Sequence, residues 1–401
     1  MENIEHVAIV GGGPAGAYCA YELAKKGIYA TIFDHSHPRE KPCGGGLSAL
    51  AIEKFPIIRK VPVKRGIGRK LRLISPSGYE VRVGTGYSVG ISRLHMDNYI
   101  LDSALRKGAK LVKEKVIAVR QEDAIWTIRT REKTLRAKIL VGADGVNSIV
   151  RRSLVGPIPR ENFYYAYGYF VKGLERELTT MKFLKNQIGY IWIFPRRINT
   201  SIGIALQKGD LRHMRGQLDS FLQEFYPKRK FEVLSKWGGL IPTSDKVDFY
   251  NGPCAGKNWI LVGDAAGHVD PVTGEGILYA MWSGELAAKV ILNKNLRQYD
   301  YLWKNAYGYD LMAGAKSKSL SYNSFVLDLS IRIAQRSQTL SQLFFDIITT
   351  GEDYTNFEHR LIRDAPRIAV EVISSFIGLH IVSKRKELKR EATRNRKNQS
   401  R

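Results

Sequence analysis

Short, fully apolar runs that end in glycine or aspartate recur along this chain. Residues 7–10 form such a run, and the apolar positions of residues 15–26 then have helical spacing as far as Gly27. An uninterrupted apolar run between turn residues is typical of a strand buried on both faces, as in a parallel sheet. The first 27 residues are therefore predicted to form a strand, a glycine turn and a helix.

Other segments repeat this pattern. Three further apolar runs predict buried strands, at residues 29–33, 139–143 and 259–262. Residues 277–291 have the spacing of a helix, and so do residues 92–107, for which Ser92 is a suitable N-cap. Buried strands that alternate with helices indicate an α/β fold.

The middle of the chain has a different pattern. Residues 63–89 alternate in the manner of strands, with a turn at residues 76–78. Residues 164–172 and 189–206 are strand-like and rich in aromatic side chains, and beyond residue 300 the pattern is helical. We expect a sheet that roofs a cavity, followed by a helical region.

The first glycine turn is a candidate dinucleotide site. Gly11, Gly13 and Gly16 have the G-x-G-x-x-G spacing, which fits an NAD site, an FAD site or a tight strand-to-helix turn without catalytic meaning. The glycines let backbone amides approach a pyrophosphate at the positive end of the helix. Asp34, at the end of the next predicted strand, can bind ribose hydroxyls and would repel a 2′-phosphate, which disfavours NADP here.

Two later segments favour FAD over NAD. VGADGVNSIVRR at 141–152 places Asp144 after a strand, and ILVGDAAGHVDPVTGEGI at 260–277 places Asp264 after another. A carboxylate at that position can hold the ribityl hydroxyls of a flavin, while the helix that opens at Gly276 directs its N-terminal amides at the flavin ring edge. An NAD enzyme has no use for a ribityl clamp, so the three segments in this order predict FAD.

Over residues 4–300 the chain resembles the flavin monooxygenase and geranylgeranyl reductase superfamily. KPCGGGL at 41–47 is similar to the cysteine and glycine loop of geranylgeranyl reductases, which lies beside the isoalloxazine ring in that family. GYIWIFP at 189–195 is similar to the substrate-cavity signature P-x-x-Y-x-W-x-F-P, with Gln187 in place of the first proline. Because this signature belongs to the substrate cavity, the departure bears on the identity of the substrate more than on the type of reaction.

The resemblance implies a fold and a division into domains. The expected fold is α/β, with a Rossmann-like FAD-binding domain of the glutathione reductase type, an inserted, mainly antiparallel β-sheet substrate domain and a helical C-terminal region. The expected FAD-binding domain comprises residues 1–60, 90–155 and 252–298, and the substrate domain residues 61–89 and 156–251. Residues 299–383 are expected to be helical, and residues 384–401 to form a disordered basic tail.

Motifs and resemblance together predict the site. The predicted FAD-binding residues are Gly11, Gly13, Ala15, Gly16, Asp34, Cys43, Gly44, Gly46, Arg93, Val116, Asp144, Asp264, Gly276 and Ile277. The predicted substrate residues are Tyr190, Trp192, Phe194 and Pro195. Catalytic roles are predicted for Cys43, Tyr190 and Trp192. His268 and Asp270 lie in the flavin loop, where hydrogen bonding is the expected role.

Reduction of an isolated alkene makes particular demands on such a site. The alkene accepts hydride only if it is protonated early or in concert, so the site must offer an acid, a dry pocket and groups that tolerate positive charge. Tyr190, Trp192 and Phe194 would share one face of a strand and supply aromatic faces, although the same stripe also suits an ordinary core. Cys43 could supply the proton, position the alkene or simply fit a tight loop.

Composition indicates a large protein of a reducing compartment. The 401 residues are 44% hydrophobic, enough for an extended core or two to three subdomains. The three cysteines, Cys19, Cys43 and Cys254, have neither a disulfide framework nor metal spacing, which predicts the cytoplasm. No segment resembles a signal peptide or a transmembrane helix.

The net charge of +25 has several interpretations. A solvated basic surface, an anionic membrane and an acidic protein donor all fit, whereas nucleic acid fits poorly because the charge is scattered and no known module appears. Residues 384–401 hold nine Lys or Arg against Glu387 and Glu391, after the largely apolar residues 368–382. This stretch could lie in a membrane interface or pack against the enzyme as a C-terminal helix.

The predicted function is FAD-dependent saturation of geranylgeranyl chains in an archaeal-type ether-lipid precursor or an isoprenoid quinone. The sequence has no second G-x-G-x-x-G motif. The electron donor is therefore expected to be either NAD(P)H, bound at the flavin without a Rossmann unit of its own, or a ferredoxin-like protein. The alternatives are an aromatic-ring monooxygenase of the same fold and a membrane-surface electron carrier without substrate chemistry.

Overall fold

The computed structural model describes residues 4–63, 66–68, 70–84, 88–174, 177–228 and 230–398. Its first sheet holds the predicted buried strands. In order across the sheet the strands are β8 (Lys110–Val112), β2 (Thr31–Phe33), β1 (Ile4–Val10), β11 (Thr134–Gly142), β10 (Ile125–Arg129) and β9 (Ala118–Glu122), and β17 (Trp259–Leu261) also pairs with β11. The pairs β8–β2, β2–β1, β1–β11 and β11–β17 are parallel, as expected for a Rossmann-like sheet.

Helices cover this sheet and bring the three motifs together. They are α1 (Pro14–Ala24), α2 (Ala49–Lys54), α3 (Arg93–Arg106), α4 (Ile149–Leu154) and α6 (Ile277–Leu292). A Cβ on Gly284 of α6 would lie 2.3 Å from the Ala15 carbonyl oxygen, so this glycine lets α6 pack directly on α1. The close contact brings the middle of α6 against the start of α1.

The second sheet is mainly antiparallel, as predicted. Its order is β16 (Glu232–Pro242), β12 (Phe163–Lys172), β15 (Thr200–Leu206), β14 (Gly189–Pro195), β13 (Leu178–Phe183), β5 (Lys70–Ile74) and β6 (Glu80–Val83). Only the β5–β13 pair among these is parallel. A small third sheet joins β3 (Gly46–Leu47), at the end of the Cys43 loop, to β7 (Ser88–Gly90) and β4 (Gly66–Gly68).

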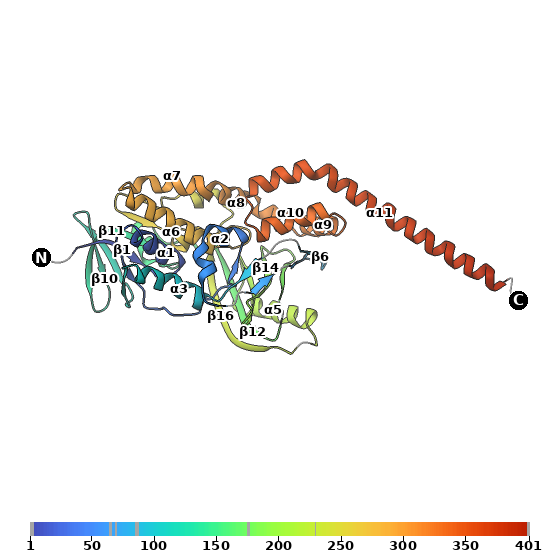
Figure 1. The fold of residues 1–401 in the computed structure, drawn as a ribbon, viewed down its shortest axis with the longest axis horizontal. Helices are drawn as coiled ribbons and strands as arrows, with labels where there is room; N and C mark the ends of the chain where they lie inside the picture. The colour runs from blue at the N-terminus through green and yellow to red at the C-terminus, as the bar shows by residue number, and fades with distance from the viewer. Residues whose placement is uncertain are drawn as a thin grey trace.

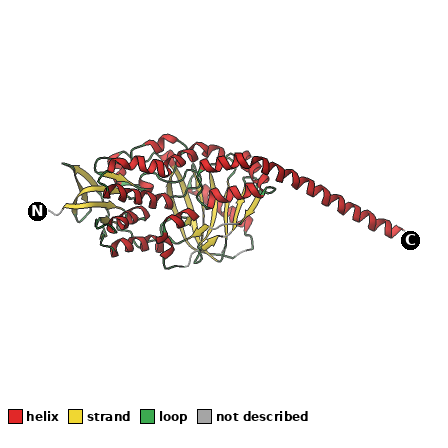
Figure 2. Ribbon diagram, turned by 45° about the horizontal axis from the view of Figure 1, so that its top comes forward, coloured by secondary structure: helices red, strands yellow, loops and turns green. Residues whose placement is uncertain are grey.

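Helices pack on both faces of the second sheet (Figures 1 and 2). One face packs on α5 (Leu211–Phe225) through Ile191 and Ile193 of β14. The other face, with Tyr190 and Trp192, belongs to a cluster that includes α9 (Ser324–Ala334) and α10 (Gln338–Thr349). The alternation along β14 therefore confirms that Tyr190 and Trp192 share a face.

The C-terminal region is helical. After α6 come α7 (Tyr299–Trp303), a π-helical turn (Lys304–Gly308), α8 (Tyr309–Ser321), α9, α10 and α11 (Tyr354–Asn398). Figure 1 shows α11 running along α10 and then beyond the body of the molecule. The backbone is helical through Asn398, where the sequence suggested a disordered tail, and side chains from residue 378 onward lie outside the description.

Candidate functional site

A cavity of about 860 Å³ lies where the two large sheets meet the Cys43 loop. It brings together all of the predicted cofactor and substrate residues except Gly16. The lining residues from the prediction are Gly11, Gly13, Ala15, Asp34, Cys43, Gly44, Gly46, Arg93, Val116, Asp144, Tyr190, Trp192, Phe194, Pro195, Asp264, Gly276 and Ile277. Segments far apart in the sequence therefore build one site.

Gly16 has a packing role. A Cβ there would lie 2.0 Å from the Gly11 carbonyl oxygen and 3.0 Å from the Ala143 Cβ, so glycine is needed for α1 to approach β1 and β11. The prediction that Gly16 contacts the cofactor stays a prediction. Helix–strand packing is one of the ordinary roles of the third glycine in such a motif.

Two helices begin at the cavity without a capping side chain. Gly13 precedes α1 and Gly276 precedes α6, and no described side chain caps either helix. Five other helices are capped by side chains, namely α2 by Ser48, α4 by Ser148, α5 by Asp210, α9 by Asn323 and α10 by Ser337. Free N-terminal amides attract anions. The start of α1 thus fits a pyrophosphate, and the start of α6 fits the electron-rich edge of a flavin.

Asp34 is held as an anion at one end of the cavity. Its Oδ2 accepts a hydrogen bond from the Gly12 amide at 2.7 Å, and its Oδ1 accepts from the Ser36 amide at 2.7 Å. Burial opposes ionisation, but the hydrogen bonds from Ser36 and Gly12 outweigh it and lower the pKa of Asp34. The carboxylate is therefore charged, as the predicted binding of ribose hydroxyls requires.

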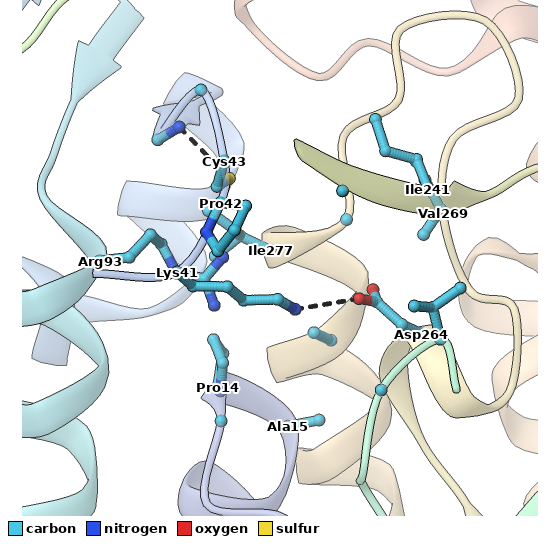
Figure 3. Close-up of a pocket in the computed structure, with 18 of the residues that line it drawn as sticks. Pro14, Ala15, Lys41, Pro42, Cys43, Arg93, Ile241, Asp264, Val269 and Ile277 are labelled. Carbon is cyan, nitrogen blue, oxygen red and sulfur yellow. Dashed lines mark hydrogen bonds and ion pairs between the residues drawn. The ribbon is translucent and has the colours of Figure 1, made fainter. Parts of the chain in front are cut away.

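The two other predicted carboxylates have different surroundings. Asp144 accepts hydrogen bonds from Ser148 Oγ and from the Ile149 amide at 2.7 Å, so it also fixes the start of α4. Asp264 forms an ion pair of 3.1 Å with Lys41, which reaches it from the Cys43 loop (Figure 3). This pair crosses the cavity in front of the start of α1, where the middle of a dinucleotide would lie.

The Cys43 loop lies flat against the aromatic wall. Cβ atoms on Gly44 and Gly46 would lie 2.9 and 3.0 Å from the Phe194 ring, so only glycine allows this approach. Cys43 Sγ accepts a hydrogen bond from the Gly45 amide at 3.3 Å and interacts with the Arg93 guanidinium. Burial opposes the charge of Arg93, but Asp97 and Cys43 raise its pKa overall.

The aromatic wall is longer than the sequence suggested. The ring of Trp192 is 5.9 Å from Tyr190, 6.1 Å from Phe194 and 5.8 Å from Trp237 of β16. Tyr190 also donates a hydrogen bond to the Thr273 carbonyl oxygen in the flavin loop. Trp237 lines the cavity and was missed, because its place beside Trp192 depends on how β16, β12, β15 and β14 align.

Sequence reasoning also missed several charged lining residues, among them Lys41 and Glu275. Lys41 stands two positions before Cys43 in the KPCGGGL loop, and Glu275 lies between Gly274 and Gly276 of the third motif. Both residues lie within motifs that the sequence analysis identified, and this position was the signal that could have indicated them. Ser92 is at the N-cap of α3 as predicted, but its hydroxyl donates to Glu40, and the Glu40 carboxylate accepts from the Arg93 amide.

The side chains of His268 and Asp270 form hydrogen bonds, as expected. His268 is buried, with Nδ1 3.0 Å from the Tyr307 hydroxyl and Nε2 3.6 Å from Cys254 Sγ. Burial lowers the pKa of His268 to about 3 and raises that of Cys254 to about 12, so both stay neutral. Asp270 accepts from the Tyr354 hydroxyl at 2.9 Å and from the Thr273 amide at 2.6 Å.

The chain is similar to known proteins. The FAD binding domain family matches residues 5–194. An uncharacterised protein of Methanosarcina barkeri is 31% identical over 308 residues, which cover 71% of this chain and 74% of the relative. The digeranylgeranylglycerophospholipid reductase of Methanococcus vannielii is 28% identical over 352 residues, covering 80% and 87%. The geranylgeranyl diphosphate reductase of Rhodobacter capsulatus is 28% identical over 304 residues, covering 71% and 74%.

Solved structures share the fold. A geranylgeranyl bacteriochlorophyll reductase-like protein from Thermoplasma acidophilum superposes with a TM-score of 0.76 at 21% identity, covering 93% of this chain and all of that one. The flavin-dependent brominase Bmp2 has a TM-score of 0.63 at 20% identity, covering 82% and 93%. With its FAD-binding architecture and reductase relatives, the chain belongs to the geranylgeranyl reductase family of FAD-dependent oxidoreductases.

Proposed function

We propose that the enzyme saturates carbon–carbon double bonds of geranylgeranyl chains carried on a polar lipid headgroup. The observation that carries this proposal is the continuity of the dinucleotide cradle with an apolar arm in one cavity. That arm is lined by Ala166, Met181, Trp192, Trp237, Ile241 and Ile348. The names of the reductase relatives support the same substrate class.

The residues of the arm suit alkene chemistry. FAD, when reduced, supplies the hydride. The apolar walls exclude water from the reacting carbons, and the rings of Trp192 and Tyr190 stabilise positive charge, an effect worth about 2 kcal/mol when desolvated. We assign Cys43 a place beside the reacting carbons, since its loop packs on Phe194 and Trp192.

The two alternatives have less support. An aromatic-ring monooxygenase would need a more polar substrate pocket than this arm. A pure electron carrier would have no use for an apolar cavity next to the flavin site.

Anaerobic turnover tests the proposal. Dithionite-reduced enzyme with a geranylgeranyl lipid should oxidise its flavin and yield product heavier by one pair of hydrogens for each saturated bond, as read by mass spectrometry. Oxygen-dependent NADPH consumption with a phenol would support the monooxygenase instead. Bound flavin with neither reaction would support the electron carrier.

We also propose that NAD(P)H or a ferredoxin-like protein reduces the flavin, and that the enzyme docks on anionic membranes through α11. One face of α11 packs on the body through Ile368 and through Glu371, which accepts a hydrogen bond from Ser337 Oγ at 2.6 Å. The outer face exposes Ile362, Val370, Ile373, Phe376 and Ile377. No helix among the described residues combines the length and apolar character that crossing a bilayer requires.

Charge along the helix supports an interfacial position. The exposed apolar side chains precede residues 384–401, with nine basic against two acidic residues. Apolar burial at the headgroup boundary and attraction of basic residues to anionic lipids act together in such helices. This position would bring a lipid substrate close to α10, which also lines the cavity through Ile348 and Thr349.

Ile373→Glu/Ile377→Glu should weaken vesicle binding more than tenfold, because burying one such side chain contributes about 1.5–3 kcal/mol. The measurement is flotation with phosphatidylcholine vesicles, with and without phosphatidylglycerol. Leu211→Glu is the matched control, since Leu211 is 61% exposed on α5, on the other face of the second sheet. Equal binding by the double variant and the control would refute the α11 interface.

A further inference from the structure

Glu275 differs from the other acidic residues that line the cavity. Those residues are Asp34, Glu114, Asp144 and Asp264. Asp264 pairs with Lys41 and Glu114 with Lys133, while Asp34 and Asp144 each accept several hydrogen bonds. Among the described residues Glu275 has no cationic partner, and its Oε1 accepts a hydrogen bond from the Ser48 amide at 3.1 Å.

Glu275 lies near three parts of the site, namely the cysteine loop, the aromatic wall and Asp264. Ser48 directly follows the strand that ends the Cys43 loop. On one side of Glu275, a Cβ on Gly274 would lie 3.4 Å from the Tyr190 hydroxyl, and on the other, a Cβ on Gly276 would lie 3.4 Å from Asp264 Oδ1. The Glu275 carboxyl therefore contacts the end of the cysteine loop, and the residues on either side of Glu275 lie near the aromatic wall and Asp264.

The surroundings of Glu275 favour a neutral carboxylic acid. The titratable groups that interact with it are Asp270 of its own loop, Tyr190 of β14 and Tyr279 of α6. Burial raises the pKa of Glu275 to about 7, the hydrogen bonds from Ser48 oppose the shift, and Asp270 adds to it. A proton is thus available here at neutral pH.

We propose that Glu275 is the acid that protonates the alkene, an inference that rests on the proposed prenyl reduction. The Glu275 carboxyl gives its proton to one alkene carbon, while the hydride from reduced FAD adds to the other. The carbon–carbon π bond breaks, two C–H bonds form, FAD is left oxidised and Glu275 becomes a carboxylate. Water returns the proton, and the external donor, NAD(P)H or a reduced iron–sulfur protein, returns the two electrons.

This assignment decides between proton supply and alkene positioning as the role of Cys43. The Cys43 sulfur accepts a hydrogen bond from the Gly45 amide and interacts with the Arg93 cation, so its contacts suit an acceptor. Cys43 then positions the chain, and Glu275 supplies the proton.

The protonation state of Glu275 can be measured without turnover. In oxidised holoenzyme with 13C-labelled glutamate, a carbonyl band of a protonated carboxyl should disappear as pH rises through about 7. The band should be absent in Glu275→Gln and present in Glu285→Gln, a control in α6, the helix that follows Glu275, whose carboxylate pairs with Lys54 at the surface. A Glu275 that is already ionised at pH 5 would overturn the proposal.

Stability gives a second readout. Because the folded pKa of Glu275 lies above its ordinary value of 4.5, the folded state holds more protons between that pH and about 7. Stability contributed by this group is present at low pH and is lost as pH rises through 7. Urea unfolding should show a flatter pH dependence for Glu275→Gln than for wild type or Glu285→Gln, and equal slopes would contradict the inference.

Single turnover tests the role itself. With FAD content verified, Glu275→Gln should slow product formation by about 10²–10⁴, the usual effect of losing a general acid. Wild type should also slow above pH 7, and that pH dependence should vanish in Glu275→Gln and persist in Glu275→Asp, which keeps an acid. A wild-type rate and pH profile in Glu275→Gln would overturn the assignment, whereas an inactive wild type would overturn the proposed function instead.

Discussion

Gly11→Ala is expected to abolish FAD retention, with at least a 100-fold loss of affinity. Gly11 has a φ of +103°, and a Cβ there would lie 2.2 Å from the Ala143 carbonyl oxygen. The left-handed backbone alone costs an alanine about 1–2 kcal/mol. The overlap with Ala143 must then push the ends of β1 and β11 apart.

The displacement would spread through the whole cradle. The Gly11 amide donates to the Phe33 carbonyl oxygen at 2.9 Å, and the Ala143 amide donates to that of Val10 at 2.8 Å. One added methyl group therefore shifts Asp34 at the end of β2 and Asp144 after β11 as well as the amides of α1. Since tenfold in affinity is about 1.4 kcal/mol, a 100-fold loss needs only about 2.7 kcal/mol.

The measurement is the ratio of FAD to protein after purification, followed by titration of the apoprotein with FAD. Gly216→Ala is the control, because a Cβ on this glycine in α5 would meet nothing within 4 Å and alanine favours a helix interior by about 1 kcal/mol. Full FAD occupancy in Gly11→Ala would show that the turn accommodates a Cβ without loss of FAD binding. The close approach of Gly11 to Ala143 would then not be required for the FAD site.

The first motif could be predicted because its determinants are local. Four buried residues of β1 form the apolar run 7–10, and Gly11 and Gly13 stand where the backbone must turn towards the cavity. The same holds for β17 and α6, whose positions follow from an apolar run, an aspartate and two glycines. Sequence alone therefore predicted the Rossmann-like layer and the segments of these motifs that line the cavity.

Contacts between distant strands and loops could not be predicted in this way. Trp237 reaches the wall because β16 aligns with β12, where a Cβ on Gly168 would lie 2.7 Å from its indole. Glu40 replaces Ser92 as the hydrogen-bond acceptor at the start of α3, although the two are far apart in sequence. Such pairings depend on strand register and on burial, which leave no periodic trace in the sequence.

Gly203→Ala is expected to lower kcat/KM for the prenyl substrate by about 100-fold with FAD still bound, because misplacing a positioning group by about 1 Å can cost that much. A Cβ on Gly203 of β15 would lie 2.2 Å from Cζ2 of Trp192. The indole cannot simply retreat, since a Cβ on Gly44 would be 3.2 Å from its Nε1 on the side of the Cys43 loop. The added methyl must push the ring towards that loop and into the apolar arm.

A compensating change makes this prediction specific. Trp192→Phe removes the part of the indole that meets position 203, so Gly203→Ala/Trp192→Phe should be no worse than Trp192→Phe alone. The coupling between the two substitutions, measured as a double-mutant cycle on kcat/KM and on thermal stability, should be favourable by about 1–3 kcal/mol, the usual cost of overpacking. Additive effects would mean that the Trp192 ring does not rest on Gly203, and the aromatic wall would then lack the support that fixes it beside the Cys43 loop.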